Sequence, residues 1–352
     1  MKKILINGLA YVDGRAAGFN NYFQNILKSF ISELPGDFKL TLLIRSDQSQ
    51  HFKEYSNLIT IKEFKCRNLF ERVIKENLFI PVISYFYSVT VFPGNISPFW
   101  MLGQYLLIVC DLNFTKFPKN FSRTHLLLRK AFQRMSLRSA KVCVAISKEV
   151  RDEILNFSGV ESEVIYVPID AGNIKRHDYH SETRTRLIVI PSSLAVHKNV
   201  AAAYEAAIKI ANEVGGIDFV FFGGWKVEAF PASFPHENIR LLGWVDSQTR
   251  DELYGQCDAV LVPSIYEGFG MPYAEALMLG IPLVCCDIPI AREIVGPYPY
   301  YIEFPYDDIK IADALRSLVT NKFCALKVAH TELPNYSIGA AGKKYIDLMK
   351  TF

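Results

Sequence analysis

Residues 264–276 read Ser-Ile-Tyr-Glu-Gly-Phe-Gly-Met-Pro-Tyr-Ala-Glu-Ala. They follow a short apolar run, Ala259–Val262, and lead into a helical segment, Ala274–Leu279. A continuous apolar run is typical of a buried parallel strand. The two glycines allow a tight turn and a close approach of the backbone to a ligand. The start of a helix presents free N–H groups that suit phosphate or sugar oxygens. The stretch therefore predicts a strand, a binding turn and a helix.

The same pattern recurs along the whole chain, because short apolar runs alternate with segments of helical periodicity. The strands we expect are Lys3–Asn7, Leu40–Ile44, Tyr85–Phe92, Tyr105–Val109, Val142–Ala145, Leu187–Ile190, Phe219–Phe222, Ala259–Val262 and Leu283–Cys285. The helices we expect are Asn21–Leu34, Lys198–Glu213, Ala274–Leu279 and Ile338–Met349. Such alternation predicts βαβ units and doubly wound sheets.

The series runs twice, once over about residues 1–165 and again from Thr185. A polar stretch, Ala171–Arg186, separates the two and reads as a linker. The predicted fold class is therefore α/β, with two Rossmann-like domains that face each other across a cleft. Ligands of open α/β sheets bind beyond the carboxyl ends of the strands, so we expect the functional residues in loops that follow strands.

Composition excludes several classes of protein. The chain has 352 residues, of which 50% are hydrophobic and 21% charged, so it is neither disordered nor a coiled coil. A net charge of +3 argues against a dedicated nucleic-acid binder. The seven cysteines form no Cys-x-x-Cys, which favours free thiols in a reducing cytosol. Residues 77–110 carry no charge, but prolines and glycines divide them, so we expect strands and a loop rather than a membrane span.

Two acids flank the glycine turn, Glu267 and Glu275. Carboxylates beside a binding turn accept hydrogen bonds from pairs of hydroxyl groups, as on a sugar or a ribose. The alternative is an ordinary strand-to-helix turn with two capping or solvated acids. The two acids, the proline at 272 and the strand–turn–helix context together favour a binding site.

This segment resembles the E-G-F-G-x-P-x-x-E-A signature of the family 4 (GT4) retaining glycosyltransferases of the GT-B fold. Further stretches match the family pattern in order: Tyr166–Asp170, Ser193–Asn199, Ile239–Val245, Leu279–Val284 and Ala291–Val295. The resemblance covers essentially the whole chain and is strongest from Tyr166 to Val295. It implies an acceptor-binding domain over residues 1–170 plus about 336–352, and a nucleotide-sugar-binding domain over residues 171–335.

The resemblance also implies roles for individual residues. Glu275 would bind the ribose hydroxyls of the donor, and Lys198 would neutralise its diphosphate, since a preorganised cation stabilises a leaving group that gains negative charge. The other donor contacts would be Gly18, His197, Val245, Glu267, Gly268, Phe269 and Gly270. His197 stands where the family often has Arg. Lys198 alone could equally be a solvated lysine at a helix start.

A second candidate place is Cys110-Asp111, after the expected strand Tyr105–Val109. The family usually has His-Asp there, and a thiol lacks the second hydrogen-bonding nitrogen of an imidazole. Asp111 is either an acceptor-binding residue or a capping acid. The catalytic candidates are thus Lys198, Glu267 and Asp111. The sequence has no metal-ligand cluster and no Asp-x-Asp, so we expect a metal-independent reaction without a cofactor.

The segment from Leu112 to Lys148 holds nine basic residues and no acid. Arg129, Lys130, Arg134 and Arg138 lie there at helical spacing. They form either a solvated helix face or a surface for anionic lipid or a lipid diphosphate. Residues 64–75 are also basic and amphipathic. Because bacterial members of the family often use lipid-linked acceptors, we expect a cytoplasmic protein on the inner face of the inner membrane.

The function that these observations favour is transfer of a hexosyl unit, preferably mannosyl from GDP-mannose, to a hydroxyl of a lipid-linked glycan in O-antigen or exopolysaccharide synthesis. Its partners would be the nucleotide-sugar donor, the glycan acceptor and an anionic membrane surface, with no nucleic acid. One alternative is a sugar-nucleotide epimerase of the same fold, which would act without an acceptor. Another is a non-catalytic protein that binds anionic lipid or RNA.

Overall fold

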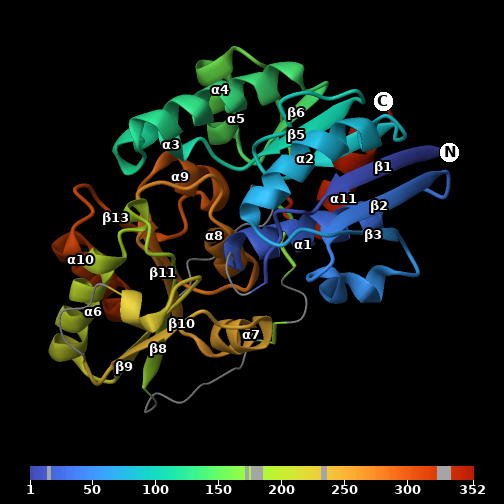
Figure 1. Ribbon diagram of the computed structural model, residues 1–352. Coiled ribbons are helices and arrows are strands. Elements are labelled where there is room, and N and C mark those ends of the chain that lie inside the picture. The colour runs from blue at the N-terminus through green and yellow to red at the C-terminus, as the bar shows by residue number, and fades with distance from the viewer. Residues whose placement is uncertain (14–16, 171–173, 176–184, 231–235, 323–333) are drawn as a thin grey trace. The chain divides into compact units, whose positions relative to one another are not determined.

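The computed structural model describes residues 1–13, 17–170, 174–175, 185–230, 236–322 and 334–352. The chain forms two compact units (Figure 1). The first comprises Met1–Asp13, Phe19–Pro168 and Tyr336–Phe352, and the second comprises Gly14–Gly18 and Ile169–Asn335. Most of the expected linker, Ala171–Arg186, lies outside the described residues.

The first unit is built on a parallel sheet in the order β3-β2-β1-β4-β5-β6-β7. Its strands are β1 (Lys2–Asn7), β2 (Phe38–Arg45), β3 (Thr60–Phe64), β4 (Val89–Phe92), β5 (Tyr105–Val109), β6 (Val142–Ala145) and β7 (Glu163–Val164). Ile4 of β1 lies opposite Leu40 on one side and Val89 on the other. The strand order reverses between β1 and β4, and parallel sheets bind ligands beyond the carboxyl ends of the strands at such a switch point.

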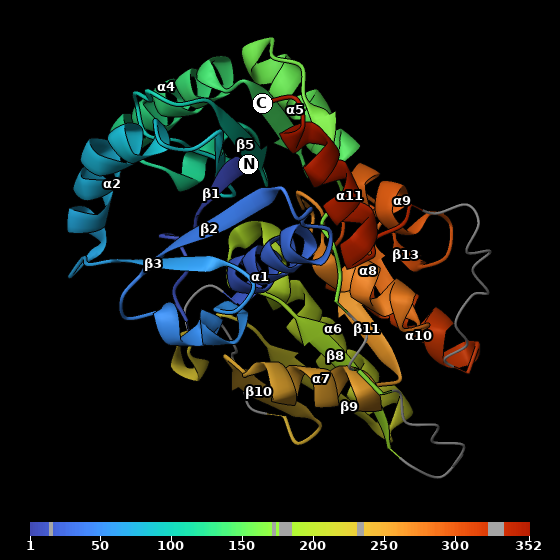
Figure 2. The ribbon, with the colours of Figure 1, turned by 90° about the vertical axis from the view of Figure 1, so that its right-hand side faces the viewer.

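Helices complete this unit: α1 (Ala17–Ser32), α2 (Leu69–Ser84), α3 (Asn113–Lys116), α4 (Arg123–Ser139), α5 (Lys148–Ser158) and α11 (Ile338–Met349). The last of them, α11, packs against α1 (Figure 2). The rings of Phe30 and Tyr345 stack at 4.9 Å between ring centres, and neither is exposed. A Cβ on Gly342 would lie 2.3 Å from the Ser29 carbonyl oxygen, so only glycine allows this approach. The end of the described chain therefore belongs to the core of the first unit.

The uncharged stretch folds differently from our expectation. We predicted a strand over Tyr85–Phe92, whereas α2 continues to Ser84 and the strand is confined to Val89–Phe92. The Asn68 side chain caps α2 by accepting from the Glu71 backbone N–H at 2.8 Å. The helix buries few of its side chains, so its sequence lacks a clear apolar stripe and was misread. Among the described helices, none has both the length and the apolar character that crossing a bilayer requires.

The second unit has a parallel sheet in the order β10-β9-β8-β11-β12-β13. Its strands are β8 (Arg186–Pro191), β9 (Ile217–Phe222), β10 (Ile239–Gly243), β11 (Ala259–Val262), β12 (Leu283–Cys286) and β13 (Tyr300–Ile302). Its helices are α6 (Val200–Val214), α7 (Ser247–Gln256), α8 (Met271–Met278), α9 (Pro289–Val295) and α10 (Asp308–Thr320). The order reverses between β8 and β11, which places a second switch point here. Two Rossmann-like parallel α/β units confirm the predicted fold class.

Two helix starts differ from the sequence-based expectation. Helix α8 begins at Met271 rather than Ala274, because Gly270 adopts a left-handed conformation (φ +78°) at its N-cap and a helix accepts proline in its first turn. Helix α6 begins at Val200, so Lys198 lies in a short 3-10 turn, Val196–Lys198. Asn199, with φ +52°, ends that turn.

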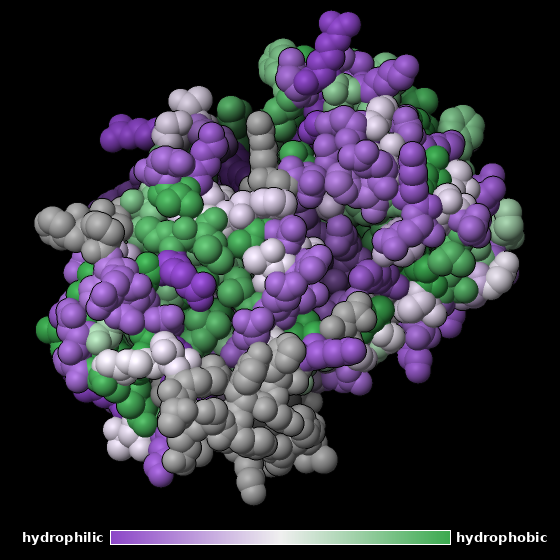
Figure 3. Space-filling model, turned by 90° about the horizontal axis from the view of Figure 1, so that it is seen from below, coloured by the Kyte–Doolittle hydropathy of each residue, from purple (hydrophilic) through white to green (hydrophobic). Residues whose placement is uncertain are grey.

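The surface is not uniform in hydropathy. Figure 3 shows one face on which hydrophilic side chains predominate and hydrophobic ones gather in a few areas between them. Large exposed hydrophobic side chains are concentrated on α2 and in the segment that follows β4. An accumulation of this kind marks an interaction surface more often than scattered single residues do.

Candidate functional site

Two loops meet at the switch point of the second unit, one after β8 and one after β11. The backbone N–H of Ile265 donates to the His197 carbonyl oxygen at 2.8 Å. The Lys198 Nζ donates to Glu267 Oε1 at 2.6 Å, and the two side chains are 21% and 12% exposed. The structure thus brings together two of the three catalytic candidates, which lie far apart in the sequence.

The Lys198–Glu267 ion pair has a direct chemical consequence. Charge-assisted hydrogen bonds of this length are about twice as strong as neutral ones. The carboxylate therefore holds the ammonium group in place and neutralises it. An incoming phosphate would compete with Glu267 for the same cation. The His197 ring lies beside this pair and packs edge-on against Tyr266 at 6.0 Å between ring centres.

Helix α8 begins directly after the Gly268–Gly270 turn. A Cβ on Gly270 would lie 2.3 Å from the ring of Tyr273, which is fully buried, so both the φ angle and the space require glycine. Phe269 is itself 3% exposed and anchors the turn in the core. The first N–H groups of α8 therefore start at a fixed position beside the ion pair.

Glu275 lies on α8 and is 7% exposed. Its Oε1 lies 3.8 Å from the Arg250 Nη1. Burial alone would lower the pKa of Arg250, but the carboxylates of Glu275 and Asp251 outweigh it and raise that pKa. Burial, and then the charge of Glu275, raises the pKa of Tyr254 well above its usual range. Arg250 and Tyr254 of α7 thus flank the Glu275 side chain and help to fix its position.

Sequence reasoning missed Arg250 and Tyr254. Both lie on α7, whose sequence has an ordinary helical composition, and their partner comes from a different helix. Because Arg250 and Glu275 lie on different helices, no fixed spacing in the sequence predicts that they meet.

The carboxyl ends of β8, β9 and β10 are packed closely together. A Cβ on Gly223 would lie 1.7 Å from the Ser192 carbonyl oxygen, which also accepts from Trp225 Nε1 at 2.9 Å. The Trp244 backbone N–H donates to the Trp225 carbonyl oxygen at 3.0 Å. This arrangement leaves the Trp244 side chain 42% exposed, with half-buried Val245 next to it, at the same edge of the sheet as Lys198.

The candidates from the first unit have clear local roles. Asp111 Oδ1 accepts from the Asn113 backbone N–H at 3.1 Å, as a turn-capping acid does. Burial raises the pKa of the Cys110 thiol to about 12. Gly18, which belongs to the second unit, lies in the first turn of α1 and is exposed; residues 14–16 lie outside the described part of the chain.

The four candidate basic residues on α4, Arg129, Lys130, Arg134 and Arg138, lie in different environments. The Arg134 guanidinium lies 4.6 Å from the centre of the Phe157 ring, and its Nε donates to the Phe157 carbonyl oxygen. Arg138 donates to the Ser158 carbonyl oxygen at 3.4 Å. Both cations therefore stabilise the carboxyl end of α5. Lys130 is half-buried, and Arg129 lines a cavity that is described below.

Solved structures with the same architecture define the class of fold. The Anabaena protein Alr3699/HepE in complex with UDP and glucose matches with a TM-score of 0.74, 15% identity and coverage of 100% of both chains. A putative UDP-N-acetylglucosamine 2-epimerase from Listeria monocytogenes matches with a TM-score of 0.66 and 15% identity, over 100% of this chain and 96% of that one. The fold is the GT-B fold, which confirms the structural part of the resemblance.

Sequence comparison adds a family assignment for part of the chain. Residues 173–335 match the model for Glycosyl transferases group 1, so the chain contains a domain of that family over most of its second unit. The O-antigen chain mannosyltransferase RfbU of Salmonella typhimurium is 24% identical over 224 residues, which are 62% of this chain and 62% of that protein. The chain spans less than two thirds of the curated relatives that it matches first.

Proposed function

We propose that this protein is a retaining GT4 glycosyltransferase that moves a hexosyl unit from a nucleoside-diphosphate sugar to a hydroxyl group of an acceptor. The observation that carries the proposal is the Lys198–Glu267 ion pair at the switch point of the second unit, beside the start of α8. A cation held at that point suits a diphosphate, and the positive end of the α8 dipole suits its oxygens.

The donor would bind in three parts. The diphosphate would take Lys198 from Glu267, and Glu267 would then turn its carboxylate toward the hydroxyls of the donor sugar. Glu275, held by Arg250, would accept from the ribose hydroxyls. The nucleobase would lie against the backbone near Val245. Because Lys198 and the helix N–H groups supply the positive charge, the reaction would need no metal ion.

The proposed chemistry keeps the configuration of the sugar. In the proposed complex the Glu267 carboxylate binds hydroxyls of the donor sugar, so we do not assign it the role of a covalent nucleophile. Instead the acceptor would attack on the face from which the diphosphate leaves. The C1–O bond to the diphosphate breaks, the acceptor oxygen bonds to C1, and the acceptor proton passes to the leaving phosphate. Lys198 stabilises the negative charge on that phosphate in the transition state.

We further propose mannosyl as the sugar and a lipid-linked O-antigen or exopolysaccharide intermediate as the acceptor. The name of the Salmonella relative, an O-antigen chain mannosyltransferase, supports this choice. The protein would then act on the cytoplasmic face of the inner membrane. Sugar-nucleotide epimerisation is the alternative that the Listeria neighbour keeps open, because it shares the same fold.

The test is a thermal-shift screen against GDP, UDP, dTDP, ADP and their sugar conjugates, first without metal and then with magnesium. Binding to the native state raises the unfolding midpoint. We expect a shift with one nucleotide that is lost in Lys198→Ala and Glu275→Ala. It should persist in Lys310→Ala, a control that removes a partly exposed lysine on α10 of the same unit.

Incubation of the selected sugar nucleotide with and without an acceptor then separates the two enzyme classes. A transferase forms a glycosylated acceptor, whereas an epimerase changes the sugar in the absence of an acceptor. If no nucleotide shifts the midpoint of folded protein, or if Lys198→Ala binds as well as wild type, the proposed donor site is wrong.

A further inference from the structure

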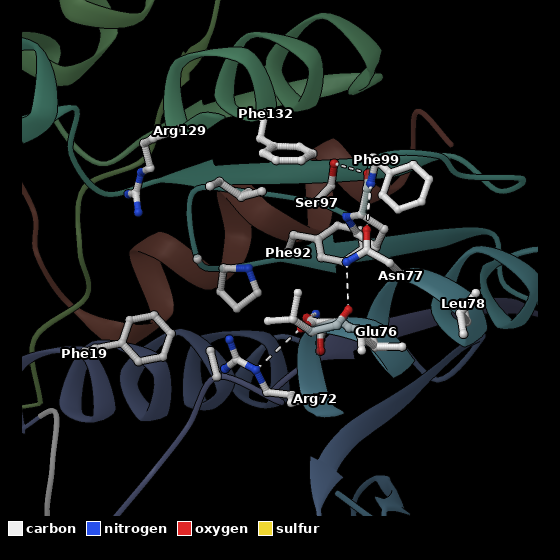
Figure 4. Close-up of a pocket in the computed structure, with 18 residues that line it drawn as sticks. Phe19, Arg72, Glu76, Asn77, Leu78, Phe92, Ser97, Phe99, Arg129 and Phe132 are labelled. Carbon is white, nitrogen blue, oxygen red and sulfur yellow. Dashed lines mark hydrogen bonds and ion pairs between the residues drawn. The ribbon is translucent and has the colours of Figure 1, made fainter. Parts of the chain in front are cut away.

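The first unit contains a cavity of about 630 Å³ at its own switch point. Asn7 at the end of β1 and Phe92 at the end of β4 contribute to it, and α2 and α4 supply opposite walls (Figure 4). Its volume falls within the range of about 300–1,000 Å³ that small-molecule sites occupy. All residues that line it belong to the first unit.

One end of the cavity is positively charged. Figure 4 shows Arg129 reaching in from α4 and Arg72 from α2, both near Phe19. Arg72 already has partners within the protein, because its Nε lies 3.7 Å from Glu76 Oε2 and its Nη1 donates to the Leu9 carbonyl oxygen. Arg129 contacts only a ring face, with its guanidinium 5.6 Å from the centre of the Phe114 ring. Within the described part of the chain it makes no ion pair, and its buried Nε has no hydrogen-bond partner.

The negative charge in the cavity is already compensated. Glu76 accepts from Asn7 Nδ2 at 2.5 Å and pairs with Arg72. The Arg129 guanidinium is therefore the positive charge in the cavity that an anion can pair with. An unpaired guanidinium that is partly removed from water is costly, and a bidentate phosphate or carboxylate is its best partner.

The other end of the cavity is apolar and open to the surface. Phe99 and Leu78 lie there in Figure 4, and they are 52% and 54% exposed. Phe132 projects from α4 between the two ends. Further large apolar side chains on α2 and after Phe99 in the chain are exposed as well: Phe79, Val82, Trp100 and Leu102. A charged inner end and an apolar open end define a site for an amphiphile.

We propose that this cavity binds a single-chain lipid phosphate, with the phosphate on Arg129 and the hydrocarbon chain along Phe132 toward Phe99 and Leu78. The inference deepens the proposed function, since such a lipid phosphate would be the anchor of the glycan acceptor. It also separates Arg129 from its neighbours on α4. Arg134 and Arg138 are bound to α5, and Lys130 does not line the cavity.

The experiment is calorimetric titration of the whole protein with dodecyl phosphate below its micelle concentration. Arg129→Gln should weaken binding about tenfold or more, because a hydrogen bond to a charged group is lost. Lys130→Gln, the matched control on the same helix, should change affinity less than about twofold. Arg129→Lys should keep part of the affinity for dodecyl phosphate that Arg129→Gln loses. Phe132→Ser should weaken binding because it removes a contact with the hydrocarbon chain of the ligand. The unfolding midpoint of each variant shows that it is folded.

Three further probes identify the occupant. Dodecyltrimethylammonium, with the same chain and the opposite charge, should not bind, and inorganic phosphate should bind far more weakly than dodecyl phosphate. Phosphatidylglycerol vesicles should bind wild type and Arg129→Gln alike. Equal losses in Arg129→Gln and Lys130→Gln, equal binding of the two detergents, or loss of vesicle binding alone would overturn the proposal.

The two proposals can fail separately. Lys198→Ala should bind dodecyl phosphate normally, and Arg129→Gln should bind the nucleotide normally. Dodecyl phosphate binding without any nucleotide binding would leave the cavity assignment intact and remove the transferase. If the protein binds a nucleotide but Arg129→Gln binds dodecyl phosphate as well as wild type does, the donor site stands and the cavity assignment is wrong.

Discussion

Replacing Glu267 with Gln should strengthen the binding of a nucleoside diphosphate, although it removes a residue of the proposed active site. Lys198 Nζ donates to Glu267 Oε1 at 2.6 Å. A diphosphate must displace that carboxylate or bind beside it, and either event is opposed by the negative charge. Glutamine keeps the shape of the side chain but not its charge, so the lysine is left free for the phosphates.

The burial of the pair sets the size of the effect. The two side chains are 21% and 12% exposed, so the interaction is stronger than a surface ion pair and weaker than a fully desolvated one. A hydrogen bond between charged groups is worth about 1.5–3 kcal/mol. If roughly half of this opposes the diphosphate, about 0.8–1.5 kcal/mol is recovered, which corresponds to about 4–13-fold tighter binding.

The assay is titration of wild type and Glu267→Gln with the nucleoside diphosphate that the thermal-shift screen selects, and then with its sugar conjugate. We expect tighter binding of the diphosphate, but slower sugar transfer, because the contact to the donor sugar is weakened. Lys198→Ala in the Glu267→Gln background should abolish the gain. Unchanged or weaker diphosphate binding in Glu267→Gln would refute the idea that Glu267 competes for this cation.

Three further outcomes follow from the geometry. Gly270→Ala should destabilise the protein by roughly 2–4 kcal/mol in thermal unfolding, since a left-handed backbone alone costs about 1–2 kcal/mol and the new Cβ also meets a buried ring. Gly280→Ala, with φ +64° and open space around it, should show only the backbone part, and equal losses would contradict this account. Arg250→Gln should weaken nucleotide binding about tenfold through the loss of a fixed Glu275, whereas nucleoside-free sugar phosphates should bind as before. The Cys110 thiol, with a pKa of about 12, should resist iodoacetamide at pH 8 in the native protein, because only about one molecule in ten thousand carries the thiolate. Rapid native-state alkylation would show that the pKa of this thiol is not raised.

Much of the fold could be predicted from the sequence, because buried parallel strands are continuous apolar runs. The expected strands Tyr105–Val109, Val142–Ala145 and Ala259–Val262 coincide with β5, β6 and β11. Helix α2 was missed for the opposite reason. The amphipathic segment 64–75 covers only its first half. From Asn77 onward the helix carries no charge and leaves several large apolar side chains exposed, so this half resembles neither a buried strand nor an amphipathic helix.

The candidate site was predictable only in part. The glycine turn and Lys198 stand in local motifs, whereas the Lys198–Glu267 pairing is a product of sheet topology, which brings the ends of β8 and β11 to one edge. Arg250 and the lipid-phosphate cavity depend on contacts between separate helices. The basic residues on α4 look equivalent in the sequence, and only packing against α5 distinguishes Arg129 from Arg134 and Arg138.

The docking of α11 on α1 has a consequence for how the protein is made. A ribosome produces the sheet of the first unit early, but Tyr345, which stacks on Phe30, follows only after the entire second unit. At roughly 5–20 residues per second this delay is on the order of ten seconds or more. During that time the aromatic surface of α1 is bare on the nascent chain. The early half of the protein therefore completes its core only when α11 arrives to cover Phe30.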